Sequence, residues 1–115
     1  MHELSIAQSL VDQIDKNAKE QKAIKVSKIA VCVGRISGVE IEALRFAFPM
    51  VVDGTPYSDT ILELEEIPFG IKCTACSTAS QPVDPFMICP SCGSDQVDLI
   101  SGRELHIKYM EIEKE

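Results

Sequence analysis

The chain has 115 residues, of which 45% are hydrophobic and a quarter are charged, and its net charge at neutral pH is −7. This composition is that of a folded chain, and the length suffices for one compact domain plus a small metal-held module. No apolar run approaches the ~18 residues of a membrane-spanning helix, and the first residues do not resemble a signal peptide. We therefore expect a cytoplasmic protein without a membrane span.

The first third of the sequence predicts one helix followed by one strand. Apolar residues recur at three- and four-residue steps from Leu4 to roughly Glu20, which is typical of an amphipathic helix. Residues 26–33 then alternate as a strand, with one face lined by branched residues and the other by small ones. Cys32 lies on the face of small residues, so we expect it to be a small core residue.

The middle and the end of the chain predict a second helix and two more strands. The second helix covers about residues 39–52, and Pro49 within it should kink or shorten the last turn because proline lacks a backbone donor. A strand is predicted from Thr60 to Ile67 and another from Glu104 to Ile112. In the last strand we expect Leu105, Ile107 and Tyr109 to share one face.

This order of elements predicts an α+β fold in which two helices pack on a three-stranded sheet. A cysteine-rich segment falls between the second and third strands, so it is expected to be an inserted four-cysteine zinc-ribbon module rather than a tail. The predicted domains are residues 1–70 together with 98–115, and residues 71–97 inserted before the last strand.

Four cysteines form two pairs, Cys73 with Cys76 and Cys89 with Cys92, separated by twelve residues. Two residues between cysteines allow one tight turn to direct both sulfurs at a single point, and two such turns supply the four thiolates that Zn(II) prefers. Gly93 can adopt the positive φ that closes the second turn. Two disulfides or an iron site are the alternatives, and a reducing cytoplasm favours a metal over disulfides.

The charge around the cysteines argues against nucleic-acid binding. Residues 71–97 contain one basic residue, Lys72, against Asp84 and Asp95. A surface that binds phosphates needs clustered lysine and arginine, so the module is expected to be structural or to face another protein.

The first residues offer a second possible metal site. Histidine is scarce, with only His2 and His106 in the chain. A free α-amine, a backbone amide nitrogen and the His2 imidazole can close fused chelate rings, and nitrogen donors in a plane suit Ni(II) or Cu(II) more than Zn(II). The alternative is that His2 is an ordinary exposed residue. His106, on the polar face of the last predicted strand, is expected to be a plain surface residue.

The sequence resembles the HypA/HybF family of nickel metallochaperones for hydrogenase maturation over essentially its whole length. Four segments carry the resemblance in chain order: the start Met-His-Glu-Leu-Ser, residues 34–40 (Gly-Arg-Ile-Ser-Gly-Val-Glu), residues 44–48 (Leu-Arg-Phe-Ala-Phe) and the two cysteine pairs. The chain departs from the usual family pattern at Arg35, where a glutamate is common, and at Pro49.

The resemblance implies a site for each metal. Nickel would be bound by the amine of Met1, the backbone nitrogen and imidazole of His2, and the backbone nitrogen of Glu3. Structural zinc would be bound by Cys73, Cys76, Cys89 and Cys92. Glu40 matches an acidic position placed near nickel in some members, although a carboxylate at a helix start is also stabilised by the helix dipole alone.

The resemblance also implies what the protein does and with which partners. It would be a nickel carrier rather than an enzyme, and it would work with the maturation GTPase of the nickel-insertion pathway and the large subunit of a nickel-iron hydrogenase. In some lineages such carriers also serve urease. The sequence contains no Ser/His/Asp set and no glycine-rich phosphate loop.

Three other functions remain open at this point. A zinc-ribbon adaptor without a nickel role would bind a protein through the acidic sheet face and would tolerate replacement of His2. A nucleic-acid-binding ribbon would show steep salt dependence. A redox protein would use the cysteine pairs as dithiols and would react without bound metal.

Overall fold

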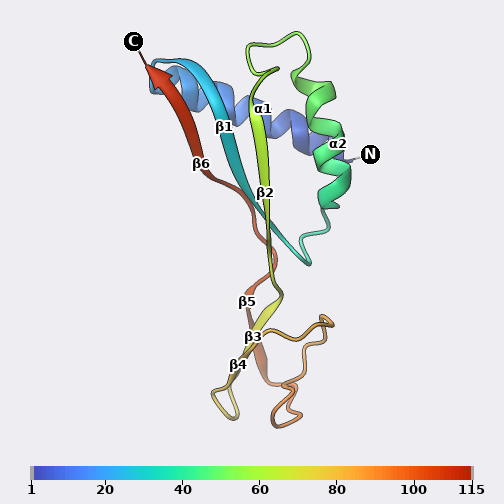
Figure 1. Cartoon of the computed structure of the whole chain (residues 1–115). Helices are drawn as coiled ribbons and strands as arrows, with labels where there is room; N and C mark the ends of the chain where they lie inside the picture. Colours follow the sequence, from blue (N-terminus) through green and yellow to red (C-terminus); the bar gives the residue numbers. More distant parts are fainter. Residues whose placement is uncertain (1, 115) are drawn as a thin grey trace. The chain divides into compact units, whose positions relative to one another are not determined.

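The computed structural model describes residues 2–114, and their side chains from Glu3 onward. The chain divides into two compact units, each formed by segments that are distant in the sequence (Figure 1). The first contains residues 1–32, 40–65 and 106–115, and the second contains residues 33–39 and 66–105. The second unit therefore includes residues 33–39, 66–70 and 98–105 in addition to the 71–97 segment of the sequence interpretation.

The first unit combines two helices with a three-stranded sheet. Helix α1 is His2–Glu20 and helix α2 is Ile41–Val52, and the sheet has the strand order β2 (Ile61–Ile67), β1 (Ala23–Gly34), β6 (Leu105–Lys114). The apolar stripe of α1 is buried, as its periodicity predicts. The core of the first unit consists of buried side chains from both helices and the central strand, and the fully buried ones include Ile14, Ile29, Val31 and Leu44. The predicted fold class is confirmed.

Helix α2 continues through its proline. Pro49 lies inside the helix, which ends at Val52. The loop that follows is fixed by polar contacts: Thr55 Oγ1 donates to the Val52 carbonyl over 2.6 Å, and the hydroxyl of buried Tyr57 donates to Asp15 Oδ1 of α1 over 2.6 Å. This second bond ties the loop after α2 to the middle of α1.

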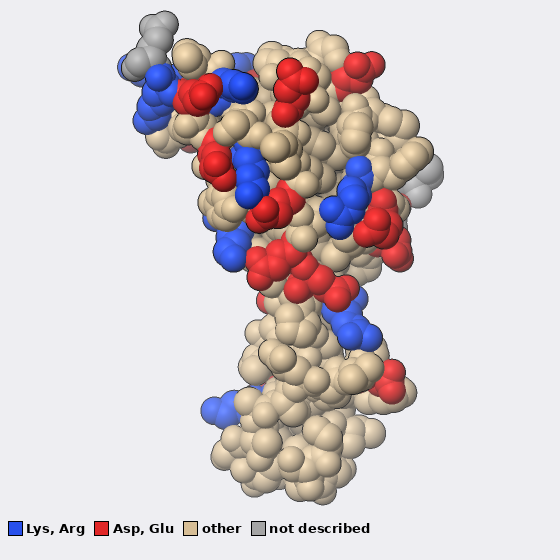
Figure 2. Space-filling view, in the orientation of Figure 1, with Lys and Arg blue, Asp and Glu red and all other residues tan. Residues whose placement is uncertain are grey.

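The outer face of the sheet holds charged pairs that cross the strands. Lys28 on central strand β1 lies 2.7 Å from a carboxylate oxygen of Glu63 on β2 and 3.8 Å from one of Glu111 on β6. The Tyr109 hydroxyl donates to Glu63 over 3.3 Å, and Lys28 Nζ lies 5.9 Å from the centre of the Tyr109 ring. Figure 2 shows such opposite charges interspersed over the viewed face of these strands.

Strand β6 corrects one sequence expectation. Leu105, Ile107 and Tyr109 were predicted to share one face of the strand, but Leu105 and Tyr109 are exposed, while Ile107, Met110 and Ile112 are partly buried. The inward alternation changes phase between Ile107 and Met110. The physical reason is that the phenol of Tyr109 finds polar partners in Glu63 and Lys28 on the outer face.

The second unit contains three short strands that the sequence did not reveal. They are β3 (Gly70–Cys73), β4 (Ala79–Ser80) and β5 (Val97–Ser101), in the order β4-β3-β5, and both pairings are antiparallel. Two glycines allow close backbone approach here. A Cβ on Gly34 would overlap the carbonyl of Gly102, and Gly102 itself has a φ of 119°. Gly34 N donates to the Glu104 carbonyl and Ile36 N to the Gly102 carbonyl over 2.6 and 2.8 Å.

Candidate metal centres

The first cysteine pair lies on a tight backbone turn that follows β3. Cys73 N donates to the Thr78 carbonyl and Ser77 N donates back to the Cys73 carbonyl, each over 2.9 Å. Ser77 has a φ of 62°, which lies in the left-handed region. Cys76 N also approaches Cys73 Sγ to 3.4 Å. The turn therefore brings the two sulfurs of the pair to one side of the backbone.

The second cysteine pair repeats this geometry residue by residue. Cys89 N donates to the Ser94 carbonyl and Gly93 N donates to the Cys89 carbonyl, each over 2.8 Å. Gly93 has a φ of 76° and so confirms the positive φ predicted for it. Ser77 occupies the equivalent position of the first pair, but its positive φ could not be predicted because serine seldom adopts that conformation.

The two turns bring all four sulfurs together. Cys73 Sγ lies 3.6 Å from Cys92 Sγ, and Cys76 Sγ lies 3.7 Å from Cys89 Sγ. All four sulfurs lie within 4.8 Å of one another. Four sulfurs bound at about 2.3 Å to one tetrahedral Zn(II) lie about 3.8 Å apart, so the two shorter distances match a tetrahedral zinc site and the donor set fits zinc.

The four cysteines differ in exposure and acidity. The first member of each pair, Cys73 and Cys89, is 1% exposed, whereas Cys76 and Cys92 are exposed. The Thr78 hydroxyl and backbone amide lower the pKa of Cys76 to about 6. The backbone amide of Ser94 also acts to lower the pKa of Cys92, but the neighbouring Cys73 thiol and partial desolvation outweigh it and raise that pKa to about 12. A bound cation would displace the remaining thiol protons.

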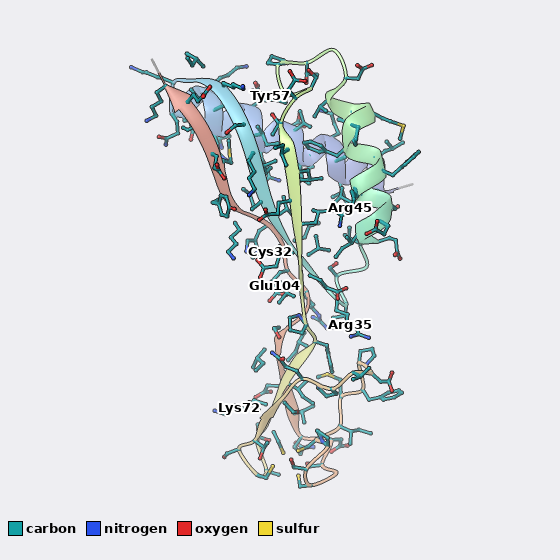
Figure 3. All side chains as sticks on the ribbon, viewed as in Figure 1. Cys32, Arg35, Arg45, Tyr57, Lys72 and Glu104 are labelled. Atoms are coloured by element: carbon teal, nitrogen blue, oxygen red, sulfur yellow. The ribbon has the colours of Figure 1, made fainter. Side chains whose placement is uncertain are left out.

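The remaining cysteine is separate from this cluster. Cys32 is buried at 5% exposure in central strand β1, where the sequence placed a small core residue (Figure 3). Among the side chains that the structure describes, the four paired cysteines form the one group of three or more potential ligands close enough to share an ion.

The residues of the predicted nickel site are described only in part. Met1 and the side chain of His2 lie outside the described residues, and helix α1 is described from His2 onward. Glu3 is partly buried in the first turn of α1. Glu40 precedes α2 in an extended conformation, is exposed and makes no capping hydrogen bond with its side chain. His106 is exposed at the start of β6.

The surface of the second unit is poor in charge. On the face drawn in Figure 2 the first unit displays most of the blue and red side chains, and few lie on the part that holds the cysteine turns. Lys72 is exposed on β3 (Figure 3), and its backbone register partner on β5 is Asp98. On the face drawn in Figure 2, the part of the unit that holds the cysteine turns shows no basic cluster of the kind that phosphate binding requires.

Comparison with known proteins agrees with this pattern of residues. A family model described as hydrogenase/urease nickel incorporation, metallochaperone, hypA matches residues 1–112. The chain belongs to the HypA family. It is 38% identical over 114 residues to the hydrogenase maturation factor HypA of Chlorobium limicola, covering 99% of this chain and 98% of the relative. It is 39% identical over 115 residues to that of Aquifex aeolicus, covering 98% of each.

The fold is also similar to solved structures of the family. The solution structure of the nickel metallochaperone HypA from Helicobacter pylori superposes with a TM-score of 0.71 at 26% sequence identity, and the match covers 100% of both chains. The chain is thus a member of a metallochaperone family for nickel incorporation into hydrogenase or urease, and it carries a four-cysteine metal-binding cluster. None of its described helices is long and apolar enough to cross a membrane.

Proposed function

We propose that the protein is a nickel metallochaperone that binds one Ni(II) at its N-terminus and delivers it to the large subunit of a nickel-iron hydrogenase during maturation. The observation that carries this proposal is the family match from residue 1 to residue 112, which includes the Met-His-Glu start. The nickel ligands are the amine of Met1, the backbone nitrogen and imidazole of His2, and the backbone nitrogen of Glu3.

The start of α1 supports backbone ligation in chemical terms. Helix α1 begins at His2, and the first four amides of a helix have no carbonyl four residues earlier, so ligation at this end leaves the i→i−4 hydrogen bonds of the helix intact. An amide must lose its proton to bind nickel, and the positive end of the helix dipole stabilises the resulting negative charge. A terminal site with few side-chain donors also suits a carrier, because the next protein can reach it.

The four-cysteine cluster has a separate, structural role in this proposal. Zinc at Cys73, Cys76, Cys89 and Cys92 fixes a zinc-ribbon domain, while the helices and the larger sheet form the nickel-binding domain. We place the protein in the cytoplasm, as a carrier and not an enzyme, with the maturation GTPase and the hydrogenase large subunit as partners. It binds no nucleic acid.

The test is nickel binding to four forms of the protein, measured by calorimetry and electronic absorption at neutral pH. These forms are the native chain, the chain with one glycine added before Met1, His2→Ala, and the matched control His106→Ala, with zinc content verified at one per chain. The proposal predicts nickel binding with a planar-type spectrum only in the native chain and the control. Equal binding by all four would remove the N-terminus from the site.

The alternative function is a zinc-ribbon adaptor without a nickel role. The observation that favours it is a run of exposed apolar side chains between the cysteine pairs, in which Val83 and Phe86 are 75% and 66% exposed. Under this alternative His2→Ala would leave biological function intact, whereas the carrier proposal predicts loss of hydrogenase maturation.

A further inference from the structure

The sulfurs of the four-cysteine cluster contact one another from one turn to the other. Cys73 Sγ lies 3.6 Å from Cys92 Sγ, and Cys76 Sγ lies 3.7 Å from Cys89 Sγ. Each contact therefore joins a cysteine of the first turn to a cysteine of the second. A disulfide bond is about 2.0 Å long, so either contact would have to shorten by about 1.7 Å to become one.

Each of these two contacts pairs an exposed cysteine with a buried one. Cys76 and Cys92 are exposed, whereas their neighbours Cys89 and Cys73 are each 1% exposed. An oxidant from solvent can therefore reach one member of each contact, while the second member lies beside it and is shielded. This arrangement favours a disulfide over further oxidation, because the buried thiolate can attack the oxidised sulfur as soon as it forms.

The folded ribbon favours disulfides between the turns over disulfides within each turn. A disulfide within one turn would leave the two turns without a covalent crosslink once the metal has left. Disulfides between the turns hold them in the positions that a shared metal ion requires. The backbone bonds that shape the turns, such as Cys89 N to the Ser94 carbonyl, can persist in this oxidised state.

The fifth cysteine of the chain is outside this chemistry. Cys32 is 5% exposed, belongs to the first unit and is not a member of the group of four close sulfurs. It therefore provides an internal reference for thiol counting. Oxidation of the cluster alone should leave one thiol of the five per chain, and that thiol should react only after the chain has been unfolded.

We propose that the four-cysteine cluster is a redox-sensitive modification site, at which hydrogen peroxide converts the metal-binding thiolates into the disulfides Cys73–Cys92 and Cys76–Cys89. This inference rests on the proposed function for its reduced state, in which the four thiolates hold structural zinc. The oxidised ribbon unit keeps its turns and has no zinc. A thiol reductant together with zinc returns it to the reduced state.

The oxidation consumes one peroxide molecule for each disulfide. The exposed thiolate of Cys76 or Cys92 attacks one peroxide oxygen, which breaks the O–O bond, forms a sulfenic acid and releases hydroxide. The neighbouring buried thiolate then attacks the sulfenic sulfur, forms the S–S bond and releases a second hydroxide. Each peroxide gains two electrons, and each of the two sulfurs loses one. The disulfides no longer offer the thiolates that bind zinc, so the ion is released.

The test treats the full-length zinc-loaded protein with a small excess of hydrogen peroxide over two molecules per chain. The matched control is Cys32→Ala, which keeps all four cysteines of the cluster. A chromogenic chelator follows the release of zinc, and thiols are counted in denaturant. We expect the native chain to lose its zinc and to fall from five thiols to one, and the control to fall from four thiols to none.

Peptide mapping then identifies the disulfides. The intact mass first establishes that the bonds lie within one chain. Proteolytic cleavage before Asp84 and Asp95 separates the two turns, so disulfides between the turns keep two peptides linked, whereas disulfides within the turns let them part. Fragmentation of the linked peptides between Cys89 and Cys92 identifies the partner of each. Amide exchange of the oxidised chain should show the turns still protected, in contrast to a reduced chain stripped of zinc.

Three results would overturn the inference. They are retention of zinc and of all five thiols under peroxide, peptides that part after cleavage, and a loss of thiols that a thiol reductant does not reverse, since that loss indicates sulfinic or sulfonic acids. The zinc content before oxidation separates this inference from the proposed function. If zinc is present and no linked peptides form, the structural zinc stands and the inference falls. If zinc is absent from the start and linked peptides still form, the disulfide site stands and the structural zinc falls.

Discussion

The first unit, called the helical unit below, buries Ile14, Ile29 and Leu44 completely in its two helices and sheet. The second unit, called the ribbon unit below, has a small apolar core that, apart from its cysteines, consists of Val33, Phe69 and Ile71. So few buried side chains cannot offset the conformational entropy of the 47 residues in the ribbon unit. The comparison indicates two different sources of stability, an apolar core in the helical unit and a four-cysteine cluster that could hold a metal ion in the ribbon unit. Each source can be removed separately.

The largest expected effect follows from removing a buried zinc ligand. Cys89→Ser should abolish zinc binding and unfold the ribbon unit, because a structural zinc site contributes about 10–16 kcal/mol to folding. Amide hydrogen exchange should then increase in residues 33–39 and 66–105, while α1 and residues 23–32 of β1 stay protected. Cys32→Ala is the matched control and should keep one zinc per chain, because Cys32 lies outside the cluster. Loss of protection in both units would contradict the separation.

The converse test leaves the cysteine cluster intact and creates a cavity in the core of the helical unit. Leu44 is fully buried, so Leu44→Ala should lower the free energy of unfolding of that unit by about 2–5 kcal/mol. Zinc content should remain one per chain. Ile24, 64% exposed on β1, provides the control, since Ile24→Ala should change little in a urea titration followed by circular dichroism. A zinc site lost in Leu44→Ala would show that the ribbon depends on the helical core.

The two cysteine turns allow a finer test within the ribbon unit. Gly93→Ala should destabilise the zinc-bound unit by about 1–2 kcal/mol, because alanine is strained at the φ of 76° that Gly93 adopts. No atom lies within 4 Å of the added Cβ, so the cost arises from the backbone alone. Ser77→Gly at the equivalent position should stabilise the unit slightly, since its φ is 62°. Competition with a chelator measures the zinc affinity of both variants. Equal changes in zinc affinity, of the same sign, would refute the equivalence of the two turns.

The smallest expected effect concerns the hydrogen bond from Tyr57 to Asp15. Tyr57→Phe should lower the free energy of unfolding of the helical unit by about 1 kcal/mol, the usual net value of one hydrogen bond. Tyr109→Phe serves as the control and should cost less, because the hydrogen bond that it removes is exposed and longer, at 3.3 Å.

The same contact predicts a dependence of stability on pH. Burial, together with the bond to Asp15, raises the pKa of Tyr57 to about 12 from its ordinary value of 10.0. The folded state therefore retains a proton that the unfolded state loses, so the contribution is complete below pH 10 and is lost as the pH rises toward 12. Absorbance titration of Tyr109→Phe isolates Tyr57, and ionisation near pH 10 would contradict the contact.

Local patterns allowed the sequence to predict part of this molecule. The helices and the longer strands follow from apolar periodicity, and the cysteine cluster follows from spacing because each turn closes within six residues, as from Cys73 to Thr78. The positive φ of Gly93 was predicted for the same reason, since it closes the second turn locally. Strands β3, β4 and β5 were missed because they contain two to five residues and no repeated apolar pattern.

Other features depend on contacts between distant residues, which no local pattern shows. The bond between Tyr57 and Asp15 joins residues 42 positions apart, and the face of Tyr109 is decided by Glu63 and Lys28 on other strands. The sequence also did not predict that Phe46 is exposed, because an aromatic residue in an apolar helix is expected in the core. The nickel ligands, in contrast, were identified from the first three residues and the family resemblance and remain a prediction.

The central claim is that two different metals occupy two separate sites. X-ray absorption at the nickel and zinc edges of the full-length protein loaded with one equivalent of nickel tests it directly. The account predicts a nickel shell of nitrogen or oxygen neighbours alone and a zinc shell of four sulfurs at about 2.3 Å. Sulfur in the nickel shell would place nickel at the cysteine cluster and contradict the account. A zinc shell with fewer than four sulfurs would contradict the four-cysteine zinc site.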